Sequence, residues 1–324
     1  MLLDVEGLDI DLAAGGGPRR VVRGVSVALD EGQSLGIVGE SGSGKTMTAL
    51  AIMGLLPDGA KVGGAIRFEG SDLARASEAE MQRVRGDRIG MVFQEPMTAL
   101  NPLQRVGDQV GEPLRLHRGH GPARARAEAV RGLERVRLRD PDKLARAYPF
   151  ELSGGERQRA MIAMALSCGP KLIIADEPTT ALDVTVQAKI LDLLAMLGAE
   201  SEMAMLLVSH DLAVIARHCR RVLVMYGGAV MEEGPVKAVL GQTLHPYTRA
   251  LMEARPTLGA PRGERLRAIP GAAPSGPSAP TGCAFADRCP LALEACRAAP
   301  PPLIRLPDGH SVRCIRVDAE GRLT

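Results

Sequence analysis

The chain lacks an excess of charge of either sign, a secretion signal and a long apolar run. Its 40 lysines and arginines nearly balance its 38 aspartates and glutamates, which leaves a formal net charge of +2. A balanced chain has no overall basic field that would draw it to nucleic acid, so we expect no nucleic-acid partner. The N-terminal segment MLLDVEGLDIDL carries acids where a signal peptide carries Lys or Arg, and nothing in it indicates secretion.

Apolar stretches are short. The longest uncharged apolar run before the C-terminal tail is Ala160–Pro170. That run is about half of the roughly 20 residues that a membrane-spanning helix needs. We therefore expect a soluble protein of the cytosol, and any contact with a membrane has to go through a partner.

Cysteine is scarce, because six residues in 324 are too few for a secreted scaffold held by disulfides. Cys168 and Cys219 stand alone among apolar residues, so we expect them to be small core side chains. The other four crowd into the last 42 residues with the spacing C-x5-C-x6-C-x17-C, at Cys283, Cys289, Cys296 and Cys314. A reducing compartment disfavours disulfides there, and four thiolates suit either zinc or an iron–sulfur cluster. Four free or partly buried thiols are the plainer alternative.

Apolar segments alternate with helical patterns over much of the chain. Nearly continuous apolar runs such as LIIAD, MAMLLVS and RVLVMY predict strands buried on both faces. Their alternation with helices indicates an α/β fold with a mostly parallel central sheet. From about 97 to 167 the pattern is helical and rich in Arg, and residues 270–282 form a linker rich in Pro, Gly and Ser. We expect one large domain over 1–255, which contains this helical subdomain, and a C-terminal extension over 256–324.

The segment GESGSGKT at 39–46 fits the phosphate-loop pattern G-x-x-x-x-G-K-S/T, with an apolar strand before it and a helical pattern after it. Its glycines, Gly39, Gly42 and Gly44, let the backbone fold tightly so that its N–H groups face an anion. Lys45 would reach the β- and γ-phosphates, and the Thr46 hydroxyl would complete a Mg²⁺ shell. The remaining residues of the loop are expected to line the same nucleotide site, namely Glu40, Ser41 and Ser43. A glycine-rich turn with an incidental Lys is the alternative, which the flanking strand and helix disfavour.

Two acids end the apolar run LIIADE at 172–177. In parallel α/β sheets ligands bind at the C-terminal ends of the strands, which would bring Asp176 and Glu177 beside the phosphate loop. There Asp176 would hold Mg²⁺ through water, and Glu177 would polarise the attacking water as general base. Two solvated acids at a strand end are the alternative, which is weaker here because the phosphate loop supplies a partner.

The segment LSGGERQR at 152–159 lies between these two motifs. Ser153 followed three residues later by Glu156 fits a capping box and predicts the start of a helix. The order of phosphate loop, LSGGERQR and acidic strand end resembles the nucleotide-binding subunits of ABC ATPases over roughly residues 1–255. That resemblance implies a P-loop ATPase that binds ATP and Mg²⁺.

The resemblance also implies roles for residues that would mean little alone. Gln94 would complete the Mg²⁺ shell and pass the state of the site to a membrane subunit. His210 would touch the γ-phosphate, and Asp183 would bridge two ATPase subunits. By the same resemblance, Ser153, Gly154 and Gly155 would contact the γ-phosphate of nucleotide bound to the opposite subunit. This implies a dimer with two shared sites.

One part that the resemblance leads us to expect is missing. ABC ATPases usually stack adenine on an aromatic side chain shortly before the phosphate loop, whereas residues 9–33 contain no Phe, Tyr or Trp. Val22 is our candidate to pack on the base instead.

The C-terminal part narrows the resemblance. HPYTRAL (245–251), IPG (269–271) and GCAFADRCPLALEAC (282–296) are similar to the extension of peptide-permease ATPases, a group that serves dipeptide, oligopeptide and nickel importers. Members of that group are associated with a 4Fe–4S cluster, so the resemblance favours such a cluster over zinc at the four tail cysteines. A metal centre would be a structural staple for a tail that is too short to have much core of its own.

The implied function is the ATP-hydrolysing subunit of an importer for dipeptides or oligopeptides, with a nickel or other small-solute importer as the alternative. Its implied partners are a second ATPase subunit (a paralogue or a second copy), two integral-membrane permease subunits and, indirectly, an extracellular solute-binding protein. The chain would lie peripherally on the cytoplasmic face of the cell membrane. A non-transport ABC ATPase is disfavoured, because the chain has one nucleotide domain and no heptad run. A regulatory module with an inactive site is disfavoured by intact Lys45, Asp176, Glu177 and His210.

Overall fold

The computed structural model describes residues 1–13, 17–94, 99–179, 183–254, 268–272 and 281–323. The chain divides into two compact units. The first unit contains Met1–Leu2, Leu29–Ser34 and Arg75–Val208. The second unit contains Leu3–Ala28, Leu35–Ala74 and Ser209–Thr324.

Three parallel strands form the sheet of the first unit. Strand β7 (Leu172–Asp176) pairs with β6 (Ile89–Val92) on one side, in the register Ile89↔Leu172, and with β8 (Ala204–Ser209) on the other. Every residue of β7 is buried, as a central strand covered on both faces requires. The predicted parallel sheet is therefore confirmed in this unit.

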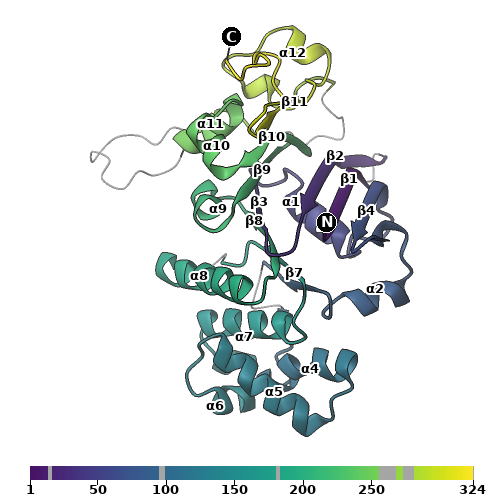
Figure 1. Ribbon diagram of the computed structural model, residues 1–324, viewed down its shortest axis with the longest axis vertical. Coiled ribbons are helices and arrows are strands. Elements are labelled where there is room, and N and C mark those ends of the chain that lie inside the picture. Colours follow the sequence, from purple (N-terminus) through teal and green to yellow (C-terminus); the bar gives the residue numbers. More distant parts are fainter. Residues whose placement is uncertain (14–16, 95–98, 180–182, 255–267, 273–280, 324) are drawn as a thin grey trace. The chain divides into compact units, whose positions relative to one another are not determined.

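Helices make up most of the remainder of the first unit. Helix α2 covers Glu78–Val84, and a group packed around α4 follows (Figure 1). Small residues let the backbones of these helices approach closely. A Cβ on Gly111 of α4 would lie 2.9 Å from the carbonyl oxygen of Ala125 in α5, and a Cβ on Gly107 would lie 2.8 Å from Ala145 in α6. The helices of this group and the one after β7 are α4 (Val106–Arg118), α5 (Pro122–Arg135), α6 (Pro141–Arg146), α7 (Gly154–Leu166) and α8 (Val184–Glu200).

The second unit opens with an antiparallel sheet in the order β2-β1-β4-β5. Strand β1 pairs with β4 from Leu3↔Phe68 to Asp11↔Lys61, and its apolar residues alternate into the core. The strands are β1 (Leu3–Leu12), β2 (Arg19–Leu29), β4 (Lys61–Phe68) and β5 (Ser71–Asp72). This sheet is the antiparallel exception to the predicted parallel arrangement. Short connections join β1 to β2 and β4 to β5, as antiparallel neighbours allow, whereas β3 and α1 lie between β2 and β4 in the chain.

Strand β3 (Ser34–Val38) runs parallel to β9 (Arg221–Tyr226), in the register Leu35↔Arg221 to Val38↔Val224. Helix α1 (Lys45–Ile52) follows β3, and α9 (Leu212–His218) precedes β9. Position 36 has to be glycine, because a Cβ there would lie 2.2 Å from the Ile215 side chain of α9. Strand β9 then turns through Gly227 and Gly228, both at positive φ, into the antiparallel strand β10 (Ala229–Pro235).

The C-terminal extension is attached to β10. Strand β12 (Ser311–Val312) pairs with β10 in the register Glu232↔Val312, and β11 (Ile304–Arg305) pairs with β12. Between them lie α10 (Val236–Gly241), α11 (Pro246–Glu253) and α12 (Ala295–Ala298) (Figure 1).

One buried carboxylate joins these pieces. Glu232 of β10 is fully buried and accepts hydrogen bonds from the amides of Leu244 and His245, at 2.8 and 3.1 Å. Its Oε1 also lies 2.8 Å from Nε2 of His310 in the tail. A buried carboxylate needs such partners to offset its lost hydration, so Glu232 links β10, the start of α11 and the final hairpin.

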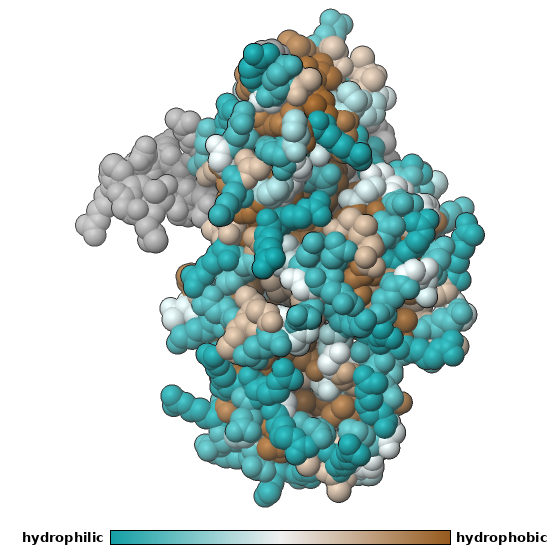
Figure 2. Space-filling view, viewed as in Figure 1, coloured by the Kyte–Doolittle hydropathy of each residue, from teal (hydrophilic) through white to brown (hydrophobic). Residues whose placement is uncertain are grey.

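Hydrophilic side chains cover much of the visible face, with smaller apolar areas among them (Figure 2). In the part of the chain that the structure describes, every helix is too short or too polar to cross a membrane.

His245, at the start of α11, should make the free energy of unfolding depend on pH. Burial lowers the pKa of His245 to about 4, from 6.5, and its Nδ1 accepts a hydrogen bond from the Tyr247 amide. Between these two pH values the unfolded chain takes up a proton that the folded chain refuses. We therefore expect unfolding to become easier as pH falls from about 6.5 to about 4, by about 3 kcal/mol for this group.

Urea unfolding of the wild type and His245→Asn across that pH range measures this effect. Asn also caps a helix but does not titrate, so the difference between the two proteins isolates His245. An identical pH dependence in both would contradict the assignment.

Candidate nucleotide site

The phosphate loop connects β3 to α1 in the second unit. Two of its glycines have backbone conformations that L side chains rarely adopt, with φ of +77° at Gly42 and +99° at Gly44. A Cβ on Gly44 would also lie 2.9 Å from the carbonyl oxygen of Val21. Thr48 anchors the loop to the helix, since its amide and its hydroxyl both donate to the Gly44 carbonyl at 2.9 Å. The glycines thus allow both the turn and its close packing.

Lys45 is buried and its ammonium folds back over the loop. Its Nζ donates to the carbonyl oxygens of Gly39 and Glu40, at 2.8 and 3.0 Å. The Ser43 hydroxyl is buried within the same loop and has no hydrogen-bond partner in the described part of the chain. A buried hydroxyl without a partner is costly, so the loop fits an anion that offers it an acceptor oxygen.

The rest of the loop is less enclosed. Ser41 and Gly42 are exposed, and Thr46, the second residue of α1, is partly buried. Glu40 is held from the C-terminal side of the unit: its amide donates to the Tyr247 hydroxyl at 2.8 Å, and its carboxylate pairs with Arg288 at 2.6 Å. We did not predict these two contacts, although Tyr247 and Arg288 lie in the HPYTRAL and GCAFADRC segments that stood out in the sequence.

The predicted acids end β7 in the first unit. Asp176 is the buried last residue of the strand. Glu177 follows with φ of +44°, and its amide donates to the carbonyl oxygen of Val208 at 3.0 Å. A non-glycine residue in this left-handed region costs roughly 1–2 kcal/mol and persists only where the surroundings hold it. The strain therefore falls on the residue that we predict to act as general base.

The LSGGERQR segment begins α7 as predicted. Ser153 caps the helix, with its Oγ accepting from the Glu156 amide at 3.4 Å while the Glu156 carboxylate accepts from the Ser153 amide at 2.8 Å. The hydroxyl of Ser153 donates to that carboxylate, which lowers the pKa of Glu156. The capping box is therefore confirmed. Gly154 and Gly155 supply backbone amides at the positive end of the helix dipole.

The start of α8 lies close to the start of α7. A Cβ on Gly155 would lie 3.1 Å from the side chain of Val186. The backbone amide of Val186 donates to the Asp183 carboxylate at 3.0 Å. Asp183 is thus the N-cap of α8 within its own chain. The carboxylate retains acceptor sites for a bridging role between subunits, since two carboxylate oxygens can accept about four hydrogen bonds.

Two other predicted residues lie at the ends of strands. Gln94 is exposed shortly after β6, and His210 is exposed directly after β8. Asp211 follows His210 and caps α9 through the Ala213 amide at 2.7 Å, so this histidine lies on a turn that is held by its neighbour.

Val22 does not fit the base-stacking role that we considered. It is fully buried, and its side chain packs toward Gly44 of the phosphate loop. Val21, its neighbour on β2, is the partly exposed residue of the pair, because successive side chains of a strand point to opposite faces.

The four tail cysteines line one small cavity, which His245 and Pro301 also border. Burial raises the pKa of Cys283 to about 11 and also raises the pKa values of Cys289 and Cys314. In the described residues, no group of three or more His, Cys, Asp or Glu side chains is placed to hold a metal ion as it stands. The structure thus brings the four thiols to one cavity without drawing them together as a ligand set.

The two isolated cysteines are buried, as predicted. Burial raises the pKa of Cys219 to about 12 and also raises the pKa of Cys168.

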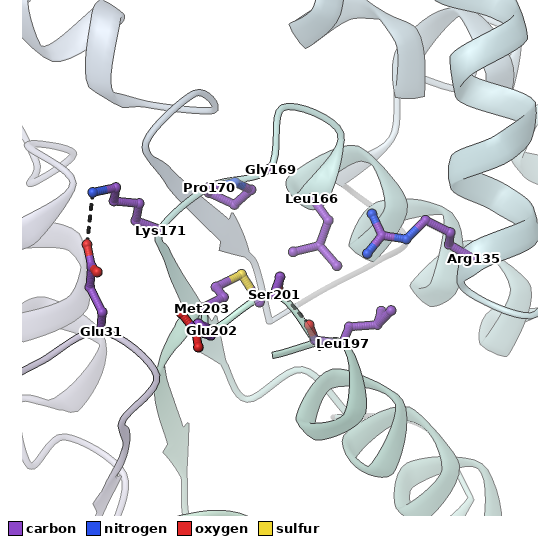
Figure 3. A pocket seen from close by; sticks show the side chains of 10 residues that line it. All are labelled: Glu31, Arg135, Leu166, Gly169, Pro170, Lys171, Leu197, Ser201, Glu202 and Met203. Atoms are coloured by element: carbon purple, nitrogen blue, oxygen red, sulfur yellow. Dashed lines mark hydrogen bonds and ion pairs between the residues drawn. The ribbon is translucent and has the colours of Figure 1, made fainter. Parts of the chain in front are cut away.

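A hollow in the first unit lies elsewhere. It is bordered by Glu31, Lys171 and the end of α8, and Lys171 pairs with Glu31 at 2.8 Å (Figure 3). Lys171 directly precedes β7, so this hollow lies at the N-terminal end of the strand, opposite to the acids. Ligands of parallel α/β sheets bind at the C-terminal ends, and we therefore do not assign the nucleotide to it.

The sequence was compared with families of known proteins. Residues 22–180 match the family model of ABC transporters, and residues 231–296 match that of the oligopeptide/dipeptide transporter C-terminal region. A putative peptide import ATP-binding protein of Brucella abortus is 50% identical over 97% of both chains. The oligopeptide transport ATP-binding protein of Escherichia coli is 48% identical, over 93% of this chain and 89% of its own length. The dipeptide transport ATP-binding protein of the same organism is 43% identical, over 100% and 99%.

A solved structure is also similar. It is a dimeric ATP-binding cassette in a post-hydrolysis state, bound to ADP and Pi, with a TM-score of 0.65 and 30% sequence identity. The match covers 72% of this chain and 99% of that one.

The glycine geometry gives a direct test of the loop. Gly44→Ala adds a strained φ and a clash with the Val21 carbonyl, whereas Gly42→Ala adds only the strain, because no atom lies within 4 Å of its built Cβ. We expect Gly42→Ala to lose about 1 kcal/mol of stability and Gly44→Ala to lose clearly more, with weaker ATP binding. Urea unfolding and titration with a fluorescent ATP analogue measure both. Equal losses in the two variants would show that the close approach at Gly44 is unimportant.

Proposed function

The chain belongs to the ATP-binding proteins of the ABC transporter family, and we propose that it is the ATP-hydrolysing subunit of an importer for dipeptides or oligopeptides. The observation that carries this proposal is similarity along nearly the whole chain, extension included, to proteins named for oligopeptide and dipeptide transport. An ATPase domain alone would be compatible with many cargoes. The C-terminal region is what connects this chain to peptide transport.

ATP would bind at residues 39–46. The loop amides and Lys45 would hold the β- and γ-phosphates, and the Ser43 hydroxyl would gain an acceptor. Oxygen atoms from Thr46, Gln94 and Asp176 are ligands that Mg²⁺ accepts in proteins. The metal ion would neutralise charge that develops on the phosphate oxygens.

Hydrolysis would depend on two residues that follow strands. Glu177 would orient the attacking water and take its proton. Its amide bond to Val208 holds the left-handed backbone and so limits where the carboxylate can reach. His210, on the turn before α9, would contact the γ-phosphate.

The start of α7 would complete the site of a second subunit. Gly154 and Gly155 would present amides to the γ-phosphate bound by the other chain, which gives two shared sites per dimer. The Ser153 hydroxyl now donates to Glu156, so it would have to turn its proton toward the phosphate. Asp183 would lie at the seam between the two subunits.

Because each site needs two chains, ATPase activity per chain should rise with protein concentration. Activity that is independent of concentration in a demonstrated monomer would contradict shared sites.

The remaining partners would be membrane proteins. Two integral-membrane permease subunits would provide the translocation path, since the described helices of this chain do not span a membrane. An extracellular solute-binding protein would deliver the peptide. The ATPase would then lie peripherally on the cytoplasmic face of the membrane.

We further propose that the tail cysteines hold an iron–sulfur cluster, with zinc as the alternative. What supports the proposal is that four cysteines, spread over 32 residues of sequence, line the same cavity. The raised pKa values of Cys283, Cys289 and Cys314 mean that these thiols would have to lose protons to a bound cation. When bound, such a centre would cross-link the tail and supply it with stability that its small core lacks.

Glu177→Gln tests the catalytic assignment. The change removes the general base and keeps the shape of the side chain, so turnover should fall by about 10²–10⁴-fold while ATP binding persists through Lys45 and the loop amides. ATPase activity is measured with the permease partners present, and ATP binding is measured separately. Glu134→Gln, an equal charge change on the exposed face of α5, is the matched control and should leave turnover unchanged. Wild-type turnover in Glu177→Gln would remove this residue from the mechanism.

Anaerobic purification tests the metal proposal. Iron and sulfide in equal amounts with a broad visible absorbance are expected in the wild type and should be lost in Cys289→Ser. Cys219→Ala, at a buried cysteine outside the cavity, should retain them. About one zinc per colourless chain would favour the alternative, and protein without metal would remove the site.

A further inference from the structure

The phosphate loop contains an acid whose position is unfavourable for its neighbourhood. Glu40 lies between Gly39 and Ser41, so its carboxylate belongs to the loop that we propose to bind a triphosphate. A like charge near a bound phosphate repels it and lowers affinity. The loop can therefore work well only if something neutralises Glu40 or turns it away.

Arg288 of the C-terminal extension does both. Its Nη1 and Nη2 donate to the two carboxylate oxygens of Glu40 at 2.6 and 3.1 Å, which is the bidentate geometry of a strong arginine–carboxylate pair. The Arg288 side chain is 8% exposed, so solvent screens this pair far less than a surface pair.

The other donors of Arg288 are also used. Nη1 donates to the Tyr226 hydroxyl at 3.0 Å, Nη2 donates to the Ile269 carbonyl at 3.1 Å, and Nε donates to the Pro270 carbonyl at 2.7 Å. A guanidinium satisfied on every nitrogen has one orientation. The fork that faces Glu40 is therefore held by the extension itself.

A cluster of aromatic rings supports this arrangement. The chain has only three tyrosines and four phenylalanines, yet Tyr226, Tyr247 and Phe285 meet here with ring centroids 4.6 to 5.2 Å apart. All three are almost fully buried. The Tyr247 hydroxyl accepts the Glu40 amide, and the Tyr226 ring lies under the Arg288 guanidinium at 5.7 Å. The amide and the carboxylate of Glu40 are thus held by residues of this cluster or in contact with it.

The sequence segments that distinguish the extension converge on this one residue. HPYTRAL supplies Tyr247, IPG supplies the carbonyls of Ile269 and Pro270, and GCAFADRC supplies Phe285 and Arg288. The carbonyl of Glu40 in turn accepts the Lys45 ammonium at 3.0 Å. A displacement of Glu40 would therefore move the lysine that is expected to hold the phosphates.

We propose that Arg288 is a positioning residue for ATP binding, which neutralises Glu40 and holds the phosphate loop in its binding conformation. This proposal rests on the proposed role of residues 39–46 as the ATP site. It gives the extension a task in the nucleotide site itself, in addition to any metal that its cysteines bind. Removal of Arg288 leaves the Glu40 carboxylate unpaired beside the triphosphate and the loop without its main tether.

The test measures the Kd of a fluorescent ATP analogue for the purified full-length chain with Mg²⁺. We expect Arg288→Ala to weaken binding about tenfold or more, as loss of a buried charged partner typically does. Arg322→Ala removes the same charge from an exposed pair with Asp318 in the same tail and should leave the Kd unchanged. Because the damage comes from an unpaired carboxylate, Glu40→Gln in the Arg288→Ala background should recover most of the affinity. A merely structural role of Arg288 would not produce that recovery.

A wild-type Kd in folded Arg288→Ala overturns the proposal, and so does failure of Glu40→Gln to recover affinity. If Arg288→Ala does not fold, Arg288→Gln provides the test, because it removes the charge that neutralises Glu40 and keeps a polar side chain. Unchanged affinity in folded Arg288→Gln would overturn the proposal. Lys45→Ala separates this proposal from the one on which it rests: full ATP binding in that variant would mean that the loop is not the ATP site, whatever Arg288 does.

Discussion

A buried ammonium group in a glycine-rich turn is the constraint on which the proposed nucleotide site depends. Lys45 is 5% exposed and therefore needs acceptors, which the carbonyls of Gly39 and Glu40 provide. The loop must then keep its backbone in a shape that only glycine allows at Gly44. Glu40 becomes the connection to the rest of the unit, since its amide and carboxylate are held by Tyr247 and Arg288. The hydrogen bonds of Lys45 and Glu40 thus connect the loop that follows β3 to the C-terminal tail.

The tail can hold the loop because it is itself docked on β10. The fully buried Glu232 binds the amides that begin α11 and lies against His310 of the last hairpin. This carboxylate orders the segment that carries Tyr247, and α11 begins with the His245 cap. Two carboxylates therefore connect these parts: the buried Glu232 attaches the extension to the sheet, and the partly exposed Glu40 attaches the phosphate loop to the extension. Three of the chain's few aromatic residues are buried at that junction and contact one another.

The first unit has a different kind of constraint, which lies in its backbone. Glu177 adopts a left-handed conformation that its amide bond to Val208 stabilises, so β8 determines where the acid after β7 can lie. The helix starts of α7 and α8 are both capped by short side chains, Ser153 and Asp183. Such caps leave other amides of the first turn available to an anion.

The sequence alone was enough to predict the parallel strands, the strand–loop–helix at 34–52, the capping box at Ser153 and the membership of the family. The structural elements depend on a few neighbouring residues, whose periodicity and backbone preferences act locally. Family membership followed from the order of the motifs along the chain. Only the tertiary structure revealed the Glu40–Arg288 pair, because the two residues are 248 positions apart and no local rule relates them. The same holds for the left-handed Glu177, which a neighbouring strand imposes, and for the burial of Val22. The four cysteines show the division most clearly: their spacing indicated a common site, but only the fold shows that all four line one cavity, because their positions in space depend on packing that the spacing does not encode.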